Sequence, residues 1–271
     1  MNTVSIHGEK NYTVPSVIHL ESITTNKYLA VYTDNCDLTI RINNQEVFYP
    51  KESIIFIGRG VNFCCTIKKY DQKKKPYRVV RLNKEEILML KDVFKSTHSY
   101  YIDEKMMESK INAKVIGVKS CQDYIKEFDS IERTSEIPLK LFKLACLISR
   151  MKEVKNIINS LVYSAATTFT DKVRNIIEGD VSRKWRLYMI ADEFNISEVS
   201  VRKRLEVEGT SFNNLLIEIR MNKAMQLLLE NEQQINKIAK DIGIFSPSYF
   251  IKGFKKHFGI TPKQFILFFR G

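Results

Sequence analysis

The sequence predicts an α+β protein in which a small antiparallel β-barrel or sandwich precedes a long helical part. Short runs rich in Val, Ile, Tyr and Phe between Tyr12 and Leu82 are typical of strands. After Asn83 the apolar residues recur at helical spacing. The C-terminal part contains two copies of a helix, a sharp turn and a second helix. We expect three segments, at residues 1–100 (β-barrel), 101–167 (helical region) and 168–271 (all-α domain).

Three stretches of the N-terminal segment carry the strand pattern. They are KYLAVYTDNCDLTIRI at 27–42, SIIFIGRGVNFCCTIKK at 53–69 and PYRVVRL at 76–82. Polar clusters such as NNQE, YPKES and YDQKKKP separate the strands and are typical of turns. The short strands at this spacing favour an antiparallel barrel or sandwich.

Helix signals continue from Asn83 onward, and the longest apolar helical pattern lies between residues 137 and 165. Its apolar residues alternate at intervals of four and three, which fits either helices packed on the β-barrel, with a break near Lys152, or a homodimer seam over 137–163. Further apolar residues widen the stripe and favour core packing, although the two interpretations are compatible. The alternating residues are Ile137, Leu141, Leu144, Ile148, Met151, Ile158 and Val162, and the widening residues are Leu139, Phe142 and Leu147.

A boundary is expected at AATTFT, residues 165–170, where Thr170 can cap a helix that begins at Asp171. The first helix–turn–helix pattern follows in LYMIADEFNISEVSVRKRLEVEG at 187–209. Its turn contains Asn195, a residue type that tolerates positive φ, and Ser197 can cap the second helix. That second helix has Val201 and Leu205 on its inward face and Val199, Arg202 and Lys203 on its outward face.

The second helix–turn–helix pattern begins with INKIAKDI at 235–242. Gly243 supplies a left-handed residue that ends the first helix, Ser246 can cap the second, and Pro247 fits its first position. The second helix has Phe250, Phe254 and Phe258 on one face and Ser248, Lys252 and Lys255 on the opposite face. One basic helix face alone is most often a solvated surface, but the repeated pattern favours a pair of DNA-binding units.

A single helix is expected to connect the two units, in SFNNLLIEIRMNKAMQLLLE at 211–230. About 27 Å of helix is the right order to hold two recognition helices in successive major grooves, about 34 Å apart. The chain has 43 Lys and Arg against 31 Asp and Glu, a net charge of +12, which favours a polyanionic partner. Basic residues flank both units, at Arg183, Lys184, Arg186, Lys255, Lys256 and Lys263.

Several classes of protein are disfavoured. No signal peptide is visible in Met1–Lys10 and no stretch is apolar enough to span a membrane, so we expect a cytoplasmic protein. No long basic amphipathic helix is visible either, so binding to a membrane surface is not expected. The five cysteines form no C-x-x-C pair and the four histidines are isolated, so neither a disulfide framework nor a metal site is indicated. The sequence also lacks a phosphate-binding loop and a nucleophile elbow, so no catalytic residues and no cofactor are expected.

The stretch IAKDIGIFSPSYFIKGFKKHFGITPKQF, at 238–265, resembles the signature of the AraC/XylS transcription regulators. The match includes the alanine and glycine of the first helix and turn, Ser-x-Ser-Tyr-Phe, Phe-Lys, and Gly-x-Thr-Pro before an aromatic residue. Elsewhere YTDNC, KPYRVVRLN, FTDKVRNIIEGDVSRKW and SEVSVRKRLE are similar to the enterobacterial virulence activators of the Rns, AggR and RegA type, with ToxT more distant.

The resemblance implies a bacterial regulator with a cupin-like β-barrel, a helical dimerisation region and two helix–turn–helix motifs. It implies binding to asymmetric AT-rich promoter sites in double-stranded DNA and activation of virulence genes through RNA polymerase, in some members by displacing the silencer H-NS. Several DNA-contacting positions depart from the family's usual amide or arginine. The expected DNA-binding residues are Val199, Ser200, Arg202, Lys203, Pro247, Ser248, Ile251, Lys252, Lys255, Lys256, Arg183 and Lys184.

The resemblance also implies that a small anionic effector, a fatty acid or bicarbonate, binds in the β-barrel. Arg81 matches a family arginine near the ligand, and Lys27 and Arg59 are further candidates, whereas Asn26 replaces a histidine of some fatty-acid-binding relatives. A lone arginine in a strand is a surface residue about as often as an anchor for an anion. The alternative function is a nonspecific DNA-binding architectural protein, because charge alone does not show sequence preference.

Overall fold

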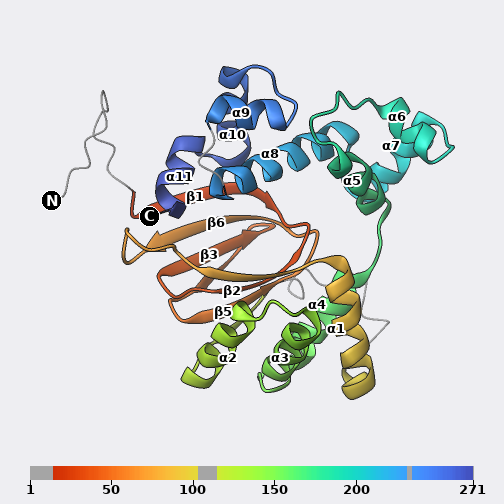
Figure 1. Ribbon diagram of the computed structural model, residues 1–271. Helices are drawn as coiled ribbons and strands as arrows, with labels where there is room; N and C mark the ends of the chain where they lie inside the picture. The colour runs from red at the N-terminus through yellow and green to blue at the C-terminus, as the bar shows by residue number, and fades with distance from the viewer. Residues whose placement is uncertain (1–14, 103–114, 231–233, 271) are drawn as a thin grey trace.

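The computed structural model describes residues 15–102, 115–230 and 234–270. The strands lie in the middle of the molecule, the helices before residue 166 cover one side, and the helices after residue 168 lie on the other side (Figure 1). Tyr12, where the sequence predicts that the strand region begins, lies outside the described residues, as does the segment Met1–Lys10. All three expected segments, 1–100, 101–167 and 168–271, are described only in part.

The described strands form two antiparallel sheets of four strands each. The first sheet has the order β1 (Val17–Thr24), β6 (Asn62–Lys69), β3 (Cys36–Ile42) and β4 (Gln45–Tyr49). The second has the order β7 (Arg78–Leu82), β2 (Tyr28–Tyr32), β5 (Ser53–Ile57) and β8 (Val115–Lys119). No ladder joins the two sheets within the described ranges, so the predicted β-barrel is open there.

Turn chemistry explains the hairpin between β3 and β4. Ile42 pairs with Gln45, so Asn43 and Asn44 alone form the loop, with φ of 45° and 65°. Two central residues with positive φ make the turn whose twist matches the strands, and asparagine tolerates that conformation better than most residues. The turn that the sequence predicts at NNQE is therefore formed by its two asparagines, whereas Gln45 and Glu46 belong to β4.

Four helices cover the second sheet: α1 (Lys84–Thr97), α2 (Gln122–Arg133), α3 (Ile137–Ser149) and α4 (Val154–Ala165), with a short 3₁₀ helix at Ser99–Tyr101. Asn83 starts α1 with a reciprocal cap, because its side chain accepts from the Glu86 amide and its own amide donates to Glu86. A buried cluster joins the strands to these helices and includes Tyr28 and Phe56. The helical conformation is interrupted between the end of α3 at Ser149 and the start of α4 at Val154, which confirms the predicted break near Lys152.

The alternating stripe of α3 and α4 packs inside the chain. Its residues from Leu141 to Val162 are buried, and Ile137 is the exposed exception. Core packing is therefore confirmed for this stripe. The apolar side chains that α3 leaves exposed are Leu139 and Phe142, at 45% and 61%, together with Ile137.

Two local predictions were wrong. The sequence predicts only helices after Asn83, yet β8 pairs with β5 through partners such as Ile116 and Phe56. This pairing joins residues about sixty positions apart, so local spacing could not reveal it. The helix expected at Asp171 begins earlier, because Thr168 rather than Thr170 caps it and bonds reciprocally with Asp171.

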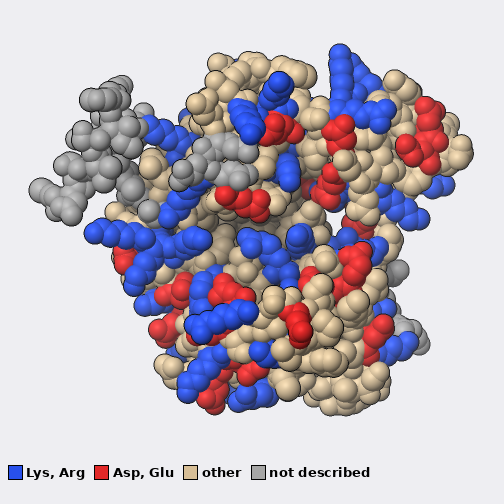
Figure 2. All heavy atoms as spheres, in the orientation of Figure 1, with Lys and Arg blue, Asp and Glu red and all other residues tan. Residues whose placement is uncertain are grey.

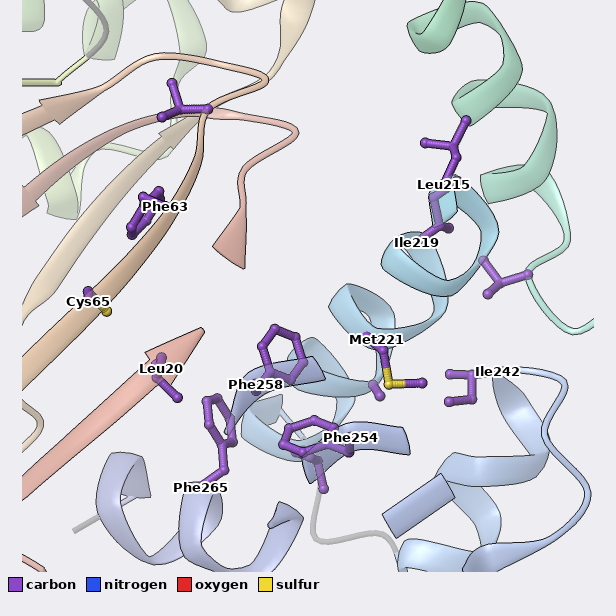
Figure 3. Close-up of a cluster of buried hydrophobic side chains, with 14 of the residues drawn as sticks. Leu20, Phe63, Cys65, Leu215, Ile219, Met221, Ile242, Phe254, Phe258 and Phe265 are labelled. Carbon is purple, nitrogen blue, oxygen red and sulfur yellow. The ribbon is translucent and has the colours of Figure 1, made fainter. Parts of the chain in front are cut away.

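Seven helices of the described chain form the C-terminal part: α5 (Phe169–Gly179), α6 (Leu187–Glu193), α7 (Glu198–Val207), α8 (Phe212–Glu230), α9 (Ile235–Asp241), α10 (Pro247–Phe258) and α11 (Pro262–Arg270). Their buried side chains join those of the first sheet in one cluster. Figure 3 shows Leu20 and Phe63 of the strands in the same cluster as Phe258 of α10 and Met221 of α8. The apolar core therefore runs from the sheet into the C-terminal helices.

Polar contacts also join the sheets to the C-terminal helices. Lys69 is buried at the end of β6, and its ammonium donates to the carbonyls of Phe268 and Gln72, each at 2.9 Å. Desolvation by burial lowers the pKa of Lys69. The Asn222 side chain on α8 donates to the Thr24 carbonyl at the end of β1, at 3.1 Å. These contacts fix the position of the C-terminal helices on the first sheet.

Candidate DNA-binding surface

Both predicted helix–turn–helix units are present. In the first unit, α6 and α7 flank a turn in which Asn195 has a φ of 51°. In the second, α9 and α10 flank a turn in which Gly243 has a φ of 76°. Ser197 and Ser246 cap α7 and α10 through bonds from the amides three residues further on. The sequence therefore predicted both turns and both caps.

Glycine is required at position 243 for a second reason. A Cβ atom there would lie 2.6 Å from the Ser182 carbonyl oxygen and 2.8 Å from a guanidinium nitrogen of Arg220. The turn of the second unit therefore packs directly on the segment between α5 and α6. The Arg220 guanidinium also donates to the Arg183 carbonyl at 3.0 Å, so the connecting helix α8 holds the same segment.

The outward face of α7 presents the predicted residues to solvent. Val201 and Leu205 are buried, whereas Val199 is 55% exposed and Arg202 and Lys203 are exposed. Ser200 is half-buried, and its hydroxyl lies 2.9 Å from that of Ser197. Arg202 pairs with Glu198 one turn earlier at 3.3 Å. An exposed pair of this kind is weak, so the Arg202 guanidinium can exchange its partner for a phosphate or a base.

The outward face of α10 likewise carries the predicted residues. Phe250, Phe254 and Phe258 are fully buried, which orients the helix. Its predicted contact residues other than the half-buried Pro247 are exposed: Ser248, Ile251, Lys252, Lys255 and Lys256. Gly259 then ends the helix with a φ of 81°. One face is therefore an apolar anchor and the opposite face is basic.

The segment between α5 and α6 carries Arg183 and Lys184, both exposed. Asp180 organises this segment, because its carboxylate accepts from Ser182 and from the Arg183 amide, and the bonds from Ser182 lower its pKa. The Arg183 guanidinium lies over the Trp185 ring, 4.8 Å from the centroid. Lys and Arg side chains project from the C-terminal helices and also cover the sheets (Figure 2). The positive charge is therefore not confined to α7 and α10, the second helices of the two helix–turn–helix units.

Helix α8 sets the separation of the two units. It is continuous over 19 residues, or about 28 Å, as the sequence predicts. Helix α7 lies near its N-terminal end and α9 near its C-terminal end (Figure 1). The length of α8 is thus of the same order as the distance of about 34 Å that separates successive major grooves.

Sequence reasoning missed how the first unit is attached. Both carboxylate oxygens of Glu208, at the end of α7, accept from the free amides of Phe169 and Thr170 at the start of α5, each at 2.7 Å. A carboxylate at a helix N-terminus satisfies unpaired amides and the helix dipole. The Thr-x-x-Asp pattern of 168–171 was the available signal for this helix start, but the partner at Glu208 is not local.

The three effector candidates occupy different environments. The Arg59 guanidinium pairs with both oxygens of Asp171 at 3.0 and 2.7 Å and donates to the carbonyls of Ser164 and Ala166. Arg81 is exposed on β7, paired in register with Leu29, and Lys27 is exposed just before β2. No hydrogen bond or ion pair joins any two of these candidates in the part of the chain that the structure describes.

Other site types find no support in the described ranges. No group of three or more His, Cys, Asp or Glu side chains there could hold a metal ion. None of the helices described is long and apolar enough to cross a membrane. Two capped helix–turn–helix units with exposed basic faces, mounted on one helix, therefore define a DNA-binding protein.

Comparison with known proteins identifies the family. Residues 190–266 match a family of helix–turn–helix domains. The chain is 38% identical to the DNA-binding dual transcriptional regulator Rns of Escherichia coli, covering 94% of this chain and 96% of Rns. It is 31% identical to the virulence regulon transcriptional activator VirF of Shigella flexneri, covering 91% and 94%. The chain belongs to the AraC/XylS family of transcription regulators, alongside these relatives, and is therefore a regulator rather than an enzyme.

The fold is shared with ToxT from Vibrio cholerae. A 1.65 Å structure of ToxT matches with a TM-score of 0.70 at 17% identity, covering 94% of this chain and 95% of ToxT. A structure of ToxT bound to an unsaturated fatty acid matches with a TM-score of 0.65 at 17% identity, covering 93% and 91%. At this identity the likeness establishes the fold alone, and it agrees with the predicted α+β architecture.

Proposed function

We propose that the protein is a bacterial transcription activator of virulence genes that binds an asymmetric AT-rich promoter site through α7 and α10. It acts in the cytoplasm, where it contacts RNA polymerase and, at silenced promoters, displaces H-NS. The names of its relatives, which are transcriptional regulators and virulence activators, support this assignment. The observation that carries it is the pair of exposed recognition helices held by one continuous helix.

The two helices have distinct roles in this proposal. Helix α7 enters one major groove with Val199, Ser200, Arg202 and Lys203. Helix α10 enters the next major groove with Pro247, Ser248, Ile251 and Lys252. The DNA phosphates are neutralised by four exposed basic residues beside the recognition helices, because such side chains displace counterions from DNA. These residues are Lys255, Lys256, Arg183 and Lys184. Because the two outward faces differ in sequence, the DNA site must be asymmetric.

Selection of bound DNA from a random pool at about 150 mM salt tests the function, since phosphate contacts alone bind weakly there. We expect one asymmetric site with two determinants about 10 base pairs apart. Lys203→Ala and Lys252→Ala should each relax one determinant and leave the other. The matched control is Lys237→Ala, an exposed lysine on α9 outside the reading faces. Binding without any enriched sequence, which disappears as salt rises, would instead identify a nonspecific architectural protein.

The same proposal includes a small anionic effector, a fatty acid or bicarbonate, bound at the β-domain. The fatty acid seen in ToxT supports a fatty acid in a protein of this fold. Arg81 and Lys27 are its anchors, because their exposed side chains are available for a carboxylate. Arg59 contributes only if the anion displaces Asp171.

Titration with fatty acids and with bicarbonate, followed by melting temperature, tests the effector. We expect the true effector to raise the melting temperature of the unchanged protein and to have no such effect on the Arg81→Ala variant. The control Lys51→Ala changes an exposed lysine on the turn between β4 and β5. An equal response of both variants would remove Arg81 from the site.

The proposal also includes a homodimer through the helical region 137–163. The exposed Leu139 and Phe142 of α3, with Ile137, provide its contact surface, because the alternating stripe is already buried within the chain. Sedimentation of Phe142→Lys against the unchanged protein tests this arrangement. A dimer that persists unchanged would place the interface elsewhere.

A further inference from the structure

We propose that the two reading helices recognise thymine through apolar contact with its 5-methyl group, by Val199 in the first unit and by Phe245 and Ile251 in the second. The inference rests on the proposed function and concerns which bases are read at that surface. Phe245 is not among the DNA-contacting positions that the sequence indicated.

These three side chains are exposed where a DNA-binding protein meets the bases. Val199 is 55% exposed at the start of α7, Ile251 is 37% exposed on α10, and Phe245 is 83% exposed in the turn just before the Ser246 cap. Single exposed apolar residues are common on protein surfaces. Here Val199 and Phe245 lie at the N-terminal ends of the two recognition helices and Ile251 lies in the first half of α10. The N-terminal parts of recognition helices approach base edges in helix–turn–helix proteins.

The polar side chains of the two helices leave a gap in base recognition. Neither α7 nor α10 contains Asn or Gln, the residues that bond adenine through two hydrogen bonds. The outward arginine and lysines, Arg202, Lys203 and Lys252, suit guanine or phosphate. An A·T pair facing these helices can therefore be distinguished mainly by the thymine methyl group, which an apolar side chain contacts.

The surroundings fit a major groove rather than an apolar protein partner. Lys252, Lys255 and Lys256 follow Ile251 on the same helix and are all exposed. Phe245 lies just before the N-terminal end of α10, next to Ser246. The Ser246 hydroxyl accepts from the Tyr249 amide and fixes the start of the helix. An apolar contact flanked by three ammonium groups is complementary to a methyl-lined groove between phosphates.

Uracil substitution tests the inference because uracil lacks only the methyl group. In the selected operator each thymine is replaced in turn by deoxyuridine, and binding is measured by fluorescence anisotropy. Removing one contacted methyl should weaken binding about fourfold, the value of one buried methyl-sized group. Val199→Ala should abolish the uracil effect in one determinant only, and Phe245→Ala combined with Ile251→Ala should abolish it in the other only.

The controls separate this inference from the proposed function. Thymines outside the two determinants should tolerate uracil, and the exposed positions of the three residues allow the variants to fold. A selected operator that tolerates uracil at every thymine would overturn the inference and leave the proposed function intact. A uracil effect that persists in both variants would also overturn it. If no site is enriched at all, the inference fails together with the proposed function.

Discussion

Replacing Gly243 by alanine should destabilise the protein much more than replacing Gly209, although both glycines have the same φ of 76°. A left-handed alanine costs about 1 kcal/mol relative to glycine, and this cost is shared by both variants. A Cβ at position 209 meets no atom within 4 Å, whereas one at position 243 meets the Ser182 carbonyl oxygen at 2.6 Å. Only Gly243 therefore carries a steric cost in addition.

The additional cost follows from what must move. Relief of the overlap requires a shift of the Ser182 backbone and of the Arg220 guanidinium, which donates to the Arg183 carbonyl. Overpacking of this kind costs about 1 to 3 kcal/mol. We therefore expect a loss of about 1 kcal/mol in the free energy of unfolding for Gly209→Ala and about 2 to 4 kcal/mol for Gly243→Ala.

Urea denaturation followed by tryptophan fluorescence measures both variants. The single tryptophan, Trp185, is buried and donates to the Asp180 carbonyl in the segment against which Gly243 packs. Binding of the selected DNA site supplies a second readout, because displacement of this turn moves α10. Equal losses of stability for the two variants would refute the steric reasoning, since left-handed geometry would then explain both.

Three further predictions concern buried polar groups. The Arg59 and Asp171 side chains are only 11% and 15% exposed, so Arg59→Ala should lower the free energy of unfolding, measured in urea, by about 3 kcal/mol. A double-mutant cycle with Asp171→Ala should show a coupling energy well above about 1 kcal/mol, and additive losses would contradict this prediction. Lys69→Met should lower stability by about 1 to 3 kcal/mol, because the two carbonyls that it bonds lose their donor. Burial lowers the pKa of His257, so the unfolded chain binds a proton more readily, and stability should fall as pH drops below about 6.5. His257→Gln should flatten this dependence, and an unchanged slope would show that other groups cause it.

Local chemistry explains why the helix–turn–helix units could be predicted in detail. The caps at Ser197 and Ser246, and the positive φ of Asn195 and Gly243, depend on residues within one turn of each other. The sequence carries these signals directly. The outward positions of both recognition helices then follow from helical spacing once the buried residues are identified.

The contacts that sequence reasoning missed join distant residues. Arg59 was predicted as a candidate for the effector site from the family resemblance, and its partner Asp171 lies 112 residues away. Strand β8 pairs with β5 although α1 lies between them in the sequence, and Glu208 bonds to a helix that begins 39 residues earlier. Periodicity and capping patterns describe neighbours along the chain, so they cannot specify such partners.

The attachment of the two units to the β-domain has a consequence for DNA binding. The first unit is fixed through α5, which pairs with Arg59 of the sheet region and bonds to Glu208 of α7. The second unit is fixed through α11, whose Phe268 carbonyl accepts from Lys69. The attachments are separate, but the units also touch each other, because the Gly243 turn packs on the segment that contains Ser182 and α8 connects both units. A change at one edge of the sheets would therefore be passed to both recognition helices and would alter their positions. Affinity for a two-part site depends on the positions of both recognition helices, so the effector that we propose for the β-domain would act on DNA binding without contacting either helix.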